Sequence, residues 1–201
     1  MPTSQDFRTP LMHLIATLSF QLGDFTLASG ARSDYYIDCR TTTLDAEGGR
    51  LAGLTLYDLI REHNLNPRAV GGLTMGADPL VSNIASASAW RRVADPTTPL
   101  IHGFLVRKSE KTHGTGRRIE GFNEPGARVV IVDDVCTTGG STIQAIEAAR
   151  AADFKIAGVL CLVDRQEQGG RAAVEAAAEG APFFSLFTAK DVRAAHISAK
   201  A

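Results

Sequence analysis

The chain has 201 residues, of which 44% are hydrophobic and 21% charged, and this balance suits one globular domain and excludes a disordered or fibrous protein. The formal net charge of -1 provides no overall attraction for nucleic acid, so any anion-binding site must be local. The sequence has no signal-peptide core, no apolar run of about 18 residues and no paired spacing among Cys39, Cys136 and Cys161, so we expect a cytoplasmic protein with reduced thiols and no membrane partner.

The first third of the chain is predicted to contain two amphipathic helices with a short extended pair between them. Apolar residues at helical spacing predict one helix from about residue 10 to 22 and another from 45 to about 64. Residues 25–30 and 35–40 are typical of two extended segments that meet at a turn around Gly30.

From residue 69 onward, short apolar strands alternate with helices. Strands are predicted at 69–73, 100–106, 128–132, 156–163 and 182–186, and helices at 79–90, 141–152 and 171–178. Thr188 to Asp191 resembles a capping box that begins a short terminal helix. Continuous apolar strands joined by helices predict the α/β class, with a mainly parallel sheet covered on both faces. Because ligands bind beyond the carboxyl ends of such strands, the loops of interest are 72–77, 107–121 and 133–141.

The most informative segment, residues 129–141, reads VVIVDDVCTTGGS. A glycine-containing turn before a helix lets consecutive backbone N–H groups converge on a phosphate, and the helix dipole adds to their attraction. The carboxylates of Asp133 and Asp134 would repel a phosphate but are strong hydrogen-bond acceptors for neighbouring hydroxyls. A sugar with vicinal hydroxyls and a terminal phosphate satisfies both halves of the segment. We therefore expect phosphate contacts from Thr137, Thr138, Gly139, Gly140 and Ser141.

This segment has neither the GxxxxGK[ST] of a Walker loop nor the GxGxxG of a dinucleotide fingerprint. From the residues alone, an acidic turn before an ordinary Gly/Ser helix start remains an alternative. The pattern resembles the phosphoribosyl diphosphate motif of the type I phosphoribosyltransferases. The resemblance implies their fold, in a single domain over residues 1–201. It also implies that Asp133 and Asp134 hold the ribose 2′ and 3′ hydroxyls, while residues 137–141 hold the 5′-phosphate.

A basic, glycine-rich loop follows the strand predicted at 100–106, and its residues 107–121 read RKSEKTHGTGRRIEG. Cations suit a polyanionic leaving group, and glycines let a loop close as a lid. By itself the loop is equally typical of a solvated surface or of a nucleic-acid contact. Its R-K-x-x-K-x-H-G pattern resembles the catalytic loop of the orotate phosphoribosyltransferases, which closes over diphosphate in the neighbouring subunit. The resemblance implies a homodimer, with diphosphate contacts from Lys108, Lys111 and His113 and with Arg107 alongside.

Two further segments resemble the same family. Residues 25–38 are similar to its N-terminal hood, in which an aromatic pair, here Tyr35 and Tyr36, lines the orotate pocket. Residues 1–45 and the C-terminal part of the chain would together form this hood. Arg165 stands where the family has an arginine that pairs with the orotate carboxylate, and a planar guanidinium suits a two-pronged contact. Without the resemblance, the tyrosines would be interpreted as core or surface aromatics and Arg165 as a surface charge.

Two positions depart from the family's pattern. Ala28 and Met75 stand where many members have a lysine, and Asp78 is a further unusual polar residue. Two cationic contacts to diphosphate are therefore missing. We expect the backbone N–H groups of residues 72–76 to bind diphosphate without them, with Thr74, Met75 and Gly76 as the contact residues.

The predicted activity is transfer of the 5-phosphoribosyl group from phosphoribosyl diphosphate to orotate. The products would be orotidine 5′-monophosphate and pyrophosphate, within pyrimidine biosynthesis. Mg²⁺ is the expected cofactor, held mainly by substrate oxygens and water, with no direct protein ligand. Two alternatives stay open, because fold does not settle substrate: a phosphoribosyltransferase for another base, and a phosphoribosyl diphosphate-sensing regulator that lacks catalysis.

Overall fold

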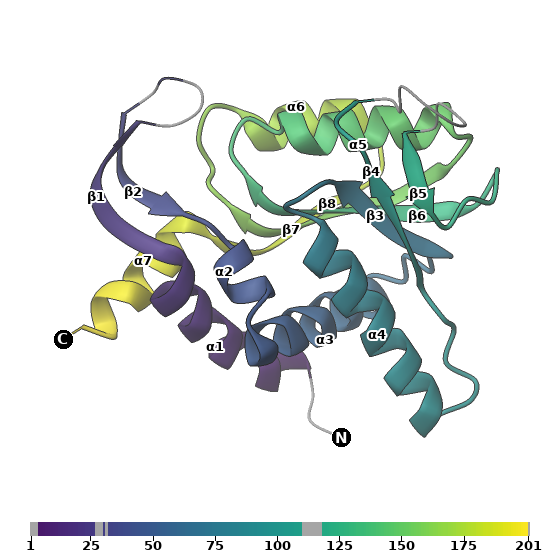
Figure 1. Cartoon of the computed structure of the whole chain (residues 1–201), viewed down its shortest axis with the longest axis horizontal. Helices are drawn as coiled ribbons and strands as arrows, with labels where there is room; N and C mark the ends of the chain where they lie inside the picture. Colours follow the sequence, from purple (N-terminus) through teal and green to yellow (C-terminus); the bar gives the residue numbers. More distant parts are fainter. Residues whose placement is uncertain (1–3, 27–29, 31, 110–117, 201) are drawn as a thin grey trace.

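The centre of the structure is a sheet with the strand order β5-β4-β3-β6-β7-β8 (Figure 1). The computed structural model describes residues 4–26, 30, 32–109 and 118–200. The prediction of a mainly parallel sheet is confirmed, because only β5 runs antiparallel to its neighbour. The strands are β3 (Ala69–Leu73), β4 (His102–Val106), β5 (Ile119–Gly121), β6 (Arg128–Cys136), β7 (Lys155–Asp164) and β8 (Phe183–Thr188).

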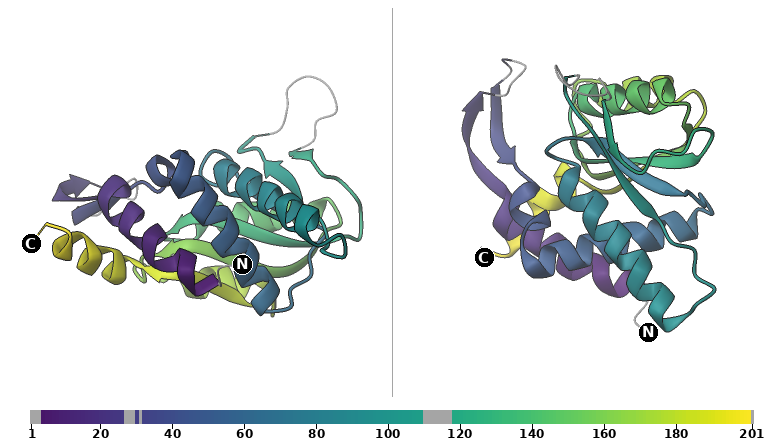
Figure 2. Two further views of the ribbon diagram at one scale, coloured as in Figure 1. Left: turned by 90° about the horizontal axis from the view of Figure 1, so that it is seen from below. Right: turned by 45° about the vertical axis from the view of Figure 1, so that its right-hand side comes forward.

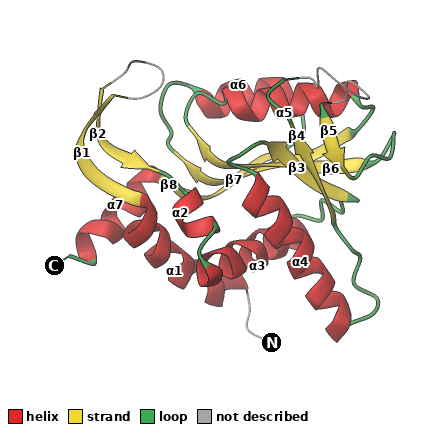
Figure 3. Cartoon of the chain, viewed as in Figure 1, coloured by secondary structure: helices red, strands yellow, loops and turns green. Residues whose placement is uncertain are grey.

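Helices cover both faces of this sheet, as the continuous apolar strands predicted (Figure 3). One face carries α5 (Gly140–Ala151) and α6 (Gly170–Ala178), and the other carries α1 (Ser4–Leu14), α3 (Ala46–Glu62) and α4 (Asp78–Ala94). Alternate side chains of β6 enter the two resulting cores. Val130 and Val132 pack in the core beneath α1, α3 and α4, and Val129 and Ile131 pack in the core beneath α5 and α6. Burial on both sides fixes the strands as a rigid base for the loops at their ends.

A separate antiparallel hairpin, β1 (Phe20–Thr26) with β2 (Arg32–Ile37), stands beside the main sheet (Figure 2). The terminal helix α7 (Ala189–Ser198) packs against its base. The buried His196 ring lies 5.0 Å from the ring of Phe20. An ion pair of 2.8 Å joins Arg193 to Asp34 on the hairpin. The C-terminal segment therefore supports the hairpin.

The predicted capping box at the start of this terminal helix is confirmed. The Thr188 hydroxyl accepts a hydrogen bond from the backbone N–H of Asp191, and the Asp191 carboxylate accepts one from the backbone N–H of Thr188. This reciprocal pair satisfies two backbone donors at the helix start. It sets the direction in which α7 leaves the last strand of the sheet.

The helix predicted at 10–22 is wrong in its second half. Helix α1 ends at Leu14, residues 15–19 form a π-helical turn, and strand β1 begins at Phe20. Leu22, which we assigned to the helix, pairs instead with Tyr35 across the hairpin. The hydrophobic spacing was compatible with a helix, but pairing with a distant strand prevailed over this local preference.

The strand predicted at 128–132 is longer than expected, because β6 continues to Cys136. Residues 133–136 were predicted to be a loop, yet Asp133, Val135 and Cys136 keep their register against β7. Two short elements were also missed: β5 lies within the predicted loop 107–121, and α2 (Arg40–Thr43) follows β2. The three cysteines are free and buried. None of the helices in the described ranges is long and apolar enough to cross a membrane.

Candidate active site

A cleft of about 640 Å³ lies at the carboxyl edge of the parallel strands. Four of its segments follow β3, β4, β6 and β7, and a fifth comes from the end of β2. The three predicted loops thus meet at one edge, where open α/β sheets bind their ligands. The residues that line the cleft are Tyr36, Ile37, Asp38, Arg40, Leu73, Thr74, Met75, Gly76, Lys108, Asp133, Asp134, Val135, Thr137, Thr138, Ser141 and Arg165.

The acidic pair forms the floor of the cleft at the end of β6. Asp133 is buried, and its carboxylate accepts a hydrogen bond of 2.5 Å from the Thr142 hydroxyl of α5. Burial and the neighbouring Asp134 raise the pKa of Asp133 to about 7. Burial also raises the pKa of Asp134, whose carboxylate accepts the Val135 N–H at 3.0 Å. Two carboxyls held this close in a poorly hydrated site gain from hydroxyl donors supplied by a ligand.

The turn after the acidic pair leads directly into the N-terminus of α5. Gly139 has φ of 78°, in the left-handed region that glycine adopts without strain. Side chains from Thr137, Thr138 and Ser141 line the cleft. Gly139 and Gly140 do not line it, and their contribution is to the path of the backbone. The helix N-terminus and three hydroxyl residues thus lie together at the cleft, in the segment where the sequence predicted phosphate contacts.

The loop after β3 faces the acidic pair across the cleft. Gly76 approaches Asp134 so closely that a Cβ at this position would lie 2.4 Å from Oδ1 of Asp134. The peptide bond between Thr74 and Met75 is cis. The N–H of Thr74 already donates to the Val106 carbonyl at 2.9 Å, so it is not the free donor that we predicted. Among the described residues, the N–H groups of Met75 and Gly76 have no acceptor.

Arg165 follows the end of β7 and lines the cleft on a different strand from the loop after β3. Its side chain is only 4% exposed and forms an ion pair of 3.0 Å with Glu167. Its Nη2 also donates to the Ser33 hydroxyl at 3.1 Å. The guanidinium lies 4.4 Å from the centre of the Tyr35 ring, within range of a cation–π contact.

The two predicted aromatic residues have different places. Tyr36 lines the cleft, whereas Tyr35 is buried beneath it and its hydroxyl donates to Glu167. Burial and this hydrogen bond raise the pKa of Tyr35 to about 12. Strand alternation explains the difference, since consecutive residues of β2 point to opposite sides. Tyr35 therefore contacts Arg165 rather than the open cleft.

Sequence reasoning missed one charged pair in the cleft, Asp38 with Arg40. The Arg40 Nε and Nη2 atoms donate to Oδ1 and Oδ2 of Asp38 at 2.8 and 2.6 Å. Hydrogen bonds from Arg40 lower the pKa of Asp38. The Asp-x-Arg spacing at the end of the extended segment predicted at 35–40 was the available signal. Without the hairpin's placement, nothing in the sequence directed these residues toward the acidic pair.

The basic loop is only partly described. Lys108 lines the cleft, whereas Arg107 does not and pairs with Glu120 at 3.3 Å. Lys111 and His113 lie outside the described residues, as does Ala28. The structure thus places one of the predicted lid cations at the cleft, next to the loop that follows β3.

Comparison with known proteins identifies this arrangement. Residues 47–174 match the family model described as "Phosphoribosyl transferase domain". An orotate phosphoribosyltransferase of Rhodopirellula baltica is 39% identical over 186 residues, which cover 90% of this chain and 92% of that protein. The enzyme of the same name from Aquifex aeolicus is 43% identical over 183 residues, covering 90% and 94%. The chain belongs to the orotate phosphoribosyltransferase family.

Solved structures agree with this assignment. A Mycobacterium tuberculosis H37Rv orotate phosphoribosyltransferase, solved with Fe(III) dicitrate, has a TM-score of 0.77 at 37% identity and covers 92% of this chain and 98% of its own. A structure of the orotate phosphoribosyltransferase from that organism with 5-phospho-alpha-D-ribosyl 1-diphosphate has a TM-score of 0.71 at 32% identity, covering 93% and 92%. The type I phosphoribosyltransferase fold expected for the chain is therefore confirmed.

Proposed function

We propose that the protein transfers the 5-phosphoribosyl group from phosphoribosyl diphosphate to orotate, giving orotidine 5′-monophosphate and pyrophosphate for pyrimidine biosynthesis. The observation that carries the proposal is that one cleft contains three features. These are the acidic pair Asp133 and Asp134, the turn at 137–141 and the cationic side chain of Arg165. Each feature suits a different part of the two substrates.

The sugar phosphate fits the acidic pair and the turn together. We propose that Asp133 and Asp134 accept hydrogen bonds from the ribose 2′ and 3′ hydroxyls. The 5′-phosphate would lie at the N-terminus of α5, with hydroxyl donors from Thr137, Thr138 and Ser141. Gly139 and Gly140 would contribute through the backbone. This orientation directs the anomeric carbon toward the middle of the cleft, between the turn and Arg165.

The base would lie at the Arg165 end. Orotate is flat and carries a carboxylate, and the guanidinium of Arg165 provides a planar donor beside Tyr36. Its Nε and Nη2 are engaged with Glu167 and Ser33, so Nη1 is the nitrogen without a partner in the described ranges. Tyr35 would act by supporting Arg165 from below. The ring nitrogen of orotate would then face the anomeric carbon.

The diphosphate would leave toward the loops after β3 and β4. We propose that the N–H groups of Met75 and Gly76, together with Lys108, stabilise the charge that develops on the leaving oxygens. Lys111 and His113 are proposed to join them when the loop closes, with Arg107 alongside. Thr74 would shape the loop, since its own N–H is engaged by Val106. As this charge develops, the ribose becomes oxocarbenium-like, as glycosyl centres do in related reactions.

Mg²⁺ is the proposed cofactor, and the carboxylates of the cleft are compatible with it. The described residues contain no group of three or more His, Cys, Asp or Glu side chains that could hold a metal ion. We propose that the ion arrives with the diphosphate, held mainly by substrate oxygens and water, with Asp134 accepting hydrogen bonds from its waters. When bound, Mg²⁺ supplies positive charge to the leaving oxygens, in addition to that of Lys108.

We further propose that residues 1–45 and the C-terminal part act as a hood over the base, within one domain. The contacts of α7 with the β1–β2 hairpin support this. The enzyme is proposed to act in the cytoplasm as a homodimer that shares its lid loop. Trp90 and Val93, exposed three residues apart on α4, are suitable for burial between subunits.

An assay of orotate consumption in the presence of phosphoribosyl diphosphate and Mg²⁺ tests the proposal. We expect orotate, followed by its absorbance, to be consumed, and we expect one pyrophosphate to be released for each orotate consumed. Consumption of adenine or hypoxanthine instead would favour a transferase for another base. Binding of phosphoribosyl diphosphate without any turnover would favour a sensing regulator. Arg165 beside the base end favours an acidic base over these alternatives.

A further inference from the structure

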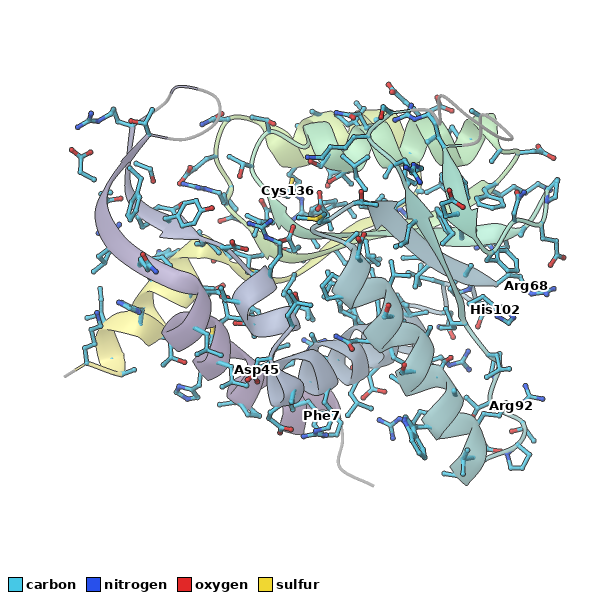
Figure 4. All side chains as sticks on the ribbon, in the orientation of Figure 1. Phe7, Asp45, Arg68, Arg92, His102 and Cys136 are labelled. Atoms are coloured by element: carbon cyan, nitrogen blue, oxygen red, sulfur yellow. The ribbon has the colours of Figure 1, made fainter. Side chains whose placement is uncertain are left out.

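A second pocket, of about 380 Å³, lies at the amino edge of the sheet, opposite the cleft. Its polar lining consists of Asn66 and the basic residues Arg61, Arg68, Arg92 and His102, and the two pockets share no residue. Figure 4 shows Arg68, His102 and Arg92 at the same end of the molecule. The volume falls within the roughly 300–1,000 Å³ of small-molecule sites. Nothing in the proposed transfer reaction uses this pocket.

Basic residues at this edge stand in a row across adjacent strands. The N–H of His102 donates to the Arg68 carbonyl at 2.9 Å, and the N–H of Arg68 donates to the Arg128 carbonyl at 2.8 Å. Arg128 pairs in turn with Lys155 on β7. The register therefore sets Arg128 beside Lys155, and it places Arg68 one position before Ala69, the register partner of His102. Because the whole chain has a net charge of -1, the positive charge of these residues is local to this edge and is not part of a general basicity of the chain.

Two of the pocket arginines have only neutral partners among the residues that the structure describes. Arg61 donates to the side-chain oxygen of Asn66 at 3.0 Å, and Arg92 donates to the Thr98 carbonyl at 3.2 Å. Arg68 alone among the pocket cations has a carboxylate partner, Glu124 at 3.1 Å, within the described part of the chain. Guanidinium groups gathered around one hollow without matching carboxylates attract an anion, and phosphate suits their geometry.

The walls of the pocket are apolar and partly planar. Pro67, Pro99, Leu100 and Ile101 line it between the basic side chains. The ring of His102 stacks on Phe122 with centroids 5.3 Å apart and an angle of 5° between the planes. A simple inorganic anion would leave this surface exposed to water. A ligand with both a phosphate and a flat organic group would cover it.

We propose that this pocket binds a phosphate monoester of nucleoside monophosphate size. Its phosphate contacts Arg61 and Arg92, and its flat group lies against Pro99, Leu100 and the edge of His102. The proposal depends on the shape and charge of the pocket and is independent of the transfer reaction. Failure of one therefore leaves the other standing.

The test is calorimetric titration of uridine 5′-monophosphate into the full-length protein with the cleft already filled by phosphoribosyl diphosphate and Mg²⁺. We expect one remaining nucleotide site per chain. Arg61→Ala and Arg92→Ala should each weaken its affinity by about tenfold, because each removes a charged donor to phosphate. Arg50→Ala is the matched control, since Arg50 pairs with Glu47 on the exposed surface of α3. It should leave the affinity unchanged.

Two further probes define the ligand. Uridine without phosphate and inorganic phosphate alone should each bind much more weakly than the nucleotide. Equal binding of inorganic phosphate would overturn the role of the apolar walls. No binding with the cleft filled, equal affinity in the arginine variants and the wild type, or binding only of a single-stranded RNA would overturn the proposal itself. Unchanged orotate turnover in Arg92→Ala would show that this variant is folded and keep its binding result interpretable.

Discussion

The buried guanidinium of Arg165 and the partly exposed carboxylate of Glu167 form an ion pair at the cleft, with Nη2 and Oε2 3.0 Å apart. Glu167 also accepts the hydroxyl hydrogen bond of Tyr35. The carboxylate of orotate and that of Glu167 would therefore share one cation. Glu167 stabilises the buried charge of Arg165 when the site is free, but it repels an acidic base.

Replacement of Glu167 by Gln should separate these two effects. The amide retains a hydrogen-bond acceptor for Tyr35 but loses its charge, so we expect the KM for orotate to fall by roughly threefold to tenfold. The melting temperature should fall by a few degrees, because Arg165 loses its counter-ion. The pKa of Tyr35, about 12 in the wild type, should fall as well, and ultraviolet absorbance titration measures it.

Glu175→Gln provides the control for this substitution. Glu175 pairs with Arg171 at 2.9 Å on the exposed surface of α6, outside the residues of the cleft. It should change neither the KM for orotate nor the tyrosine titration. A rise in the KM of the Glu167→Gln enzyme would contradict the proposed repulsion and would mean that the carboxylate is needed to orient Arg165.

The sequence was sufficient to predict the sheet, its flanking helices and the location of the turn at 137–141. These depend on local patterns: continuous apolar strands, glycine at a turn and hydroxyls at a helix start. Residues 133–141 were correctly placed at the edge of the sheet, although the strand continues to Cys136. Its extra residues pair with β7, and this long-range pairing is invisible in a local window.

The base end of the cleft was less predictable, for a related reason. Tyr35 and Tyr36 are adjacent in sequence but lie on opposite sides of a strand, and only the placement of the hairpin decides which one faces the ligand. Glu167 and Ser33, 134 positions apart in the printed numbering, contact the same guanidinium. Their roles follow from packing of the hairpin against the end of β7, which residue spacing does not encode.

Lys108 is expected to act in the transition state more than in binding. It follows β4 and lines the cleft on the side proposed for diphosphate. Lys108→Ala should lower kcat by about 10²- to 10³-fold, the usual effect of losing one preorganised charge contact. The dissociation constant for orotate should change little. Steady-state kinetics and orotate titration provide the two measurements.

Lys190→Ala is the matched control for the lysine variant, since Lys190 is exposed on α7 and does not line the cleft. Its kcat should equal that of the wild type. If Lys108→Ala retained normal turnover, the leaving-group role of this loop would have to be abandoned. If kcat were unchanged but the KM for phosphoribosyl diphosphate rose, Lys108 would bind ground state and transition state equally.

Gly139 should be the least replaceable residue of the phosphate turn. Its φ of 78° places an added Cβ in the left-handed region, and that atom would lie 2.6 Å from Cγ2 of Val174 and 2.8 Å from the Gly170 carbonyl oxygen. Gly139→Ala therefore forces the turn to move away from α6. We expect the KM for phosphoribosyl diphosphate to rise by about tenfold or more, since small displacements of positioning groups are costly.

Gly126→Ala separates backbone strain from this collision. Gly126 has φ of 80°, yet no atom lies within 4 Å of its added Cβ. Both variants should lose about 1–2 kcal/mol of stability from the left-handed conformation. Gly139→Ala alone should lose more, and it alone should change substrate affinity. Equal KM values in the two variants would show that the turn tolerates displacement, and chemical denaturation gives the stability comparison.

The raised pKa of Asp133 should lower the free energy of unfolding as the pH rises toward neutrality. Burial and Asp134 raise its pKa from 3.8 to about 7 in the folded chain. Between these values the folded state retains a proton that the unfolded state has released, so the free energy of unfolding falls with increasing pH through this window. Asp133→Asn removes the titration but retains an oxygen that accepts the Thr142 hydroxyl hydrogen bond.

The Asp133→Asn variant should therefore melt at a higher temperature than the wild type at pH 8, and the difference should shrink toward pH 4. One pKa unit corresponds to about 1.4 kcal/mol, so an advantage of several degrees is expected. Asp95→Asn is the control with the opposite sign, because hydrogen bonds from Thr97 lower the pKa of exposed Asp95. Asp133→Asn should also weaken binding of phosphoribosyl diphosphate, because an ionised carboxylate is a stronger acceptor for ribose hydroxyls than an amide oxygen. A variant that is more stable but binds the sugar phosphate less tightly would show that the buried charge is retained for function at the expense of stability.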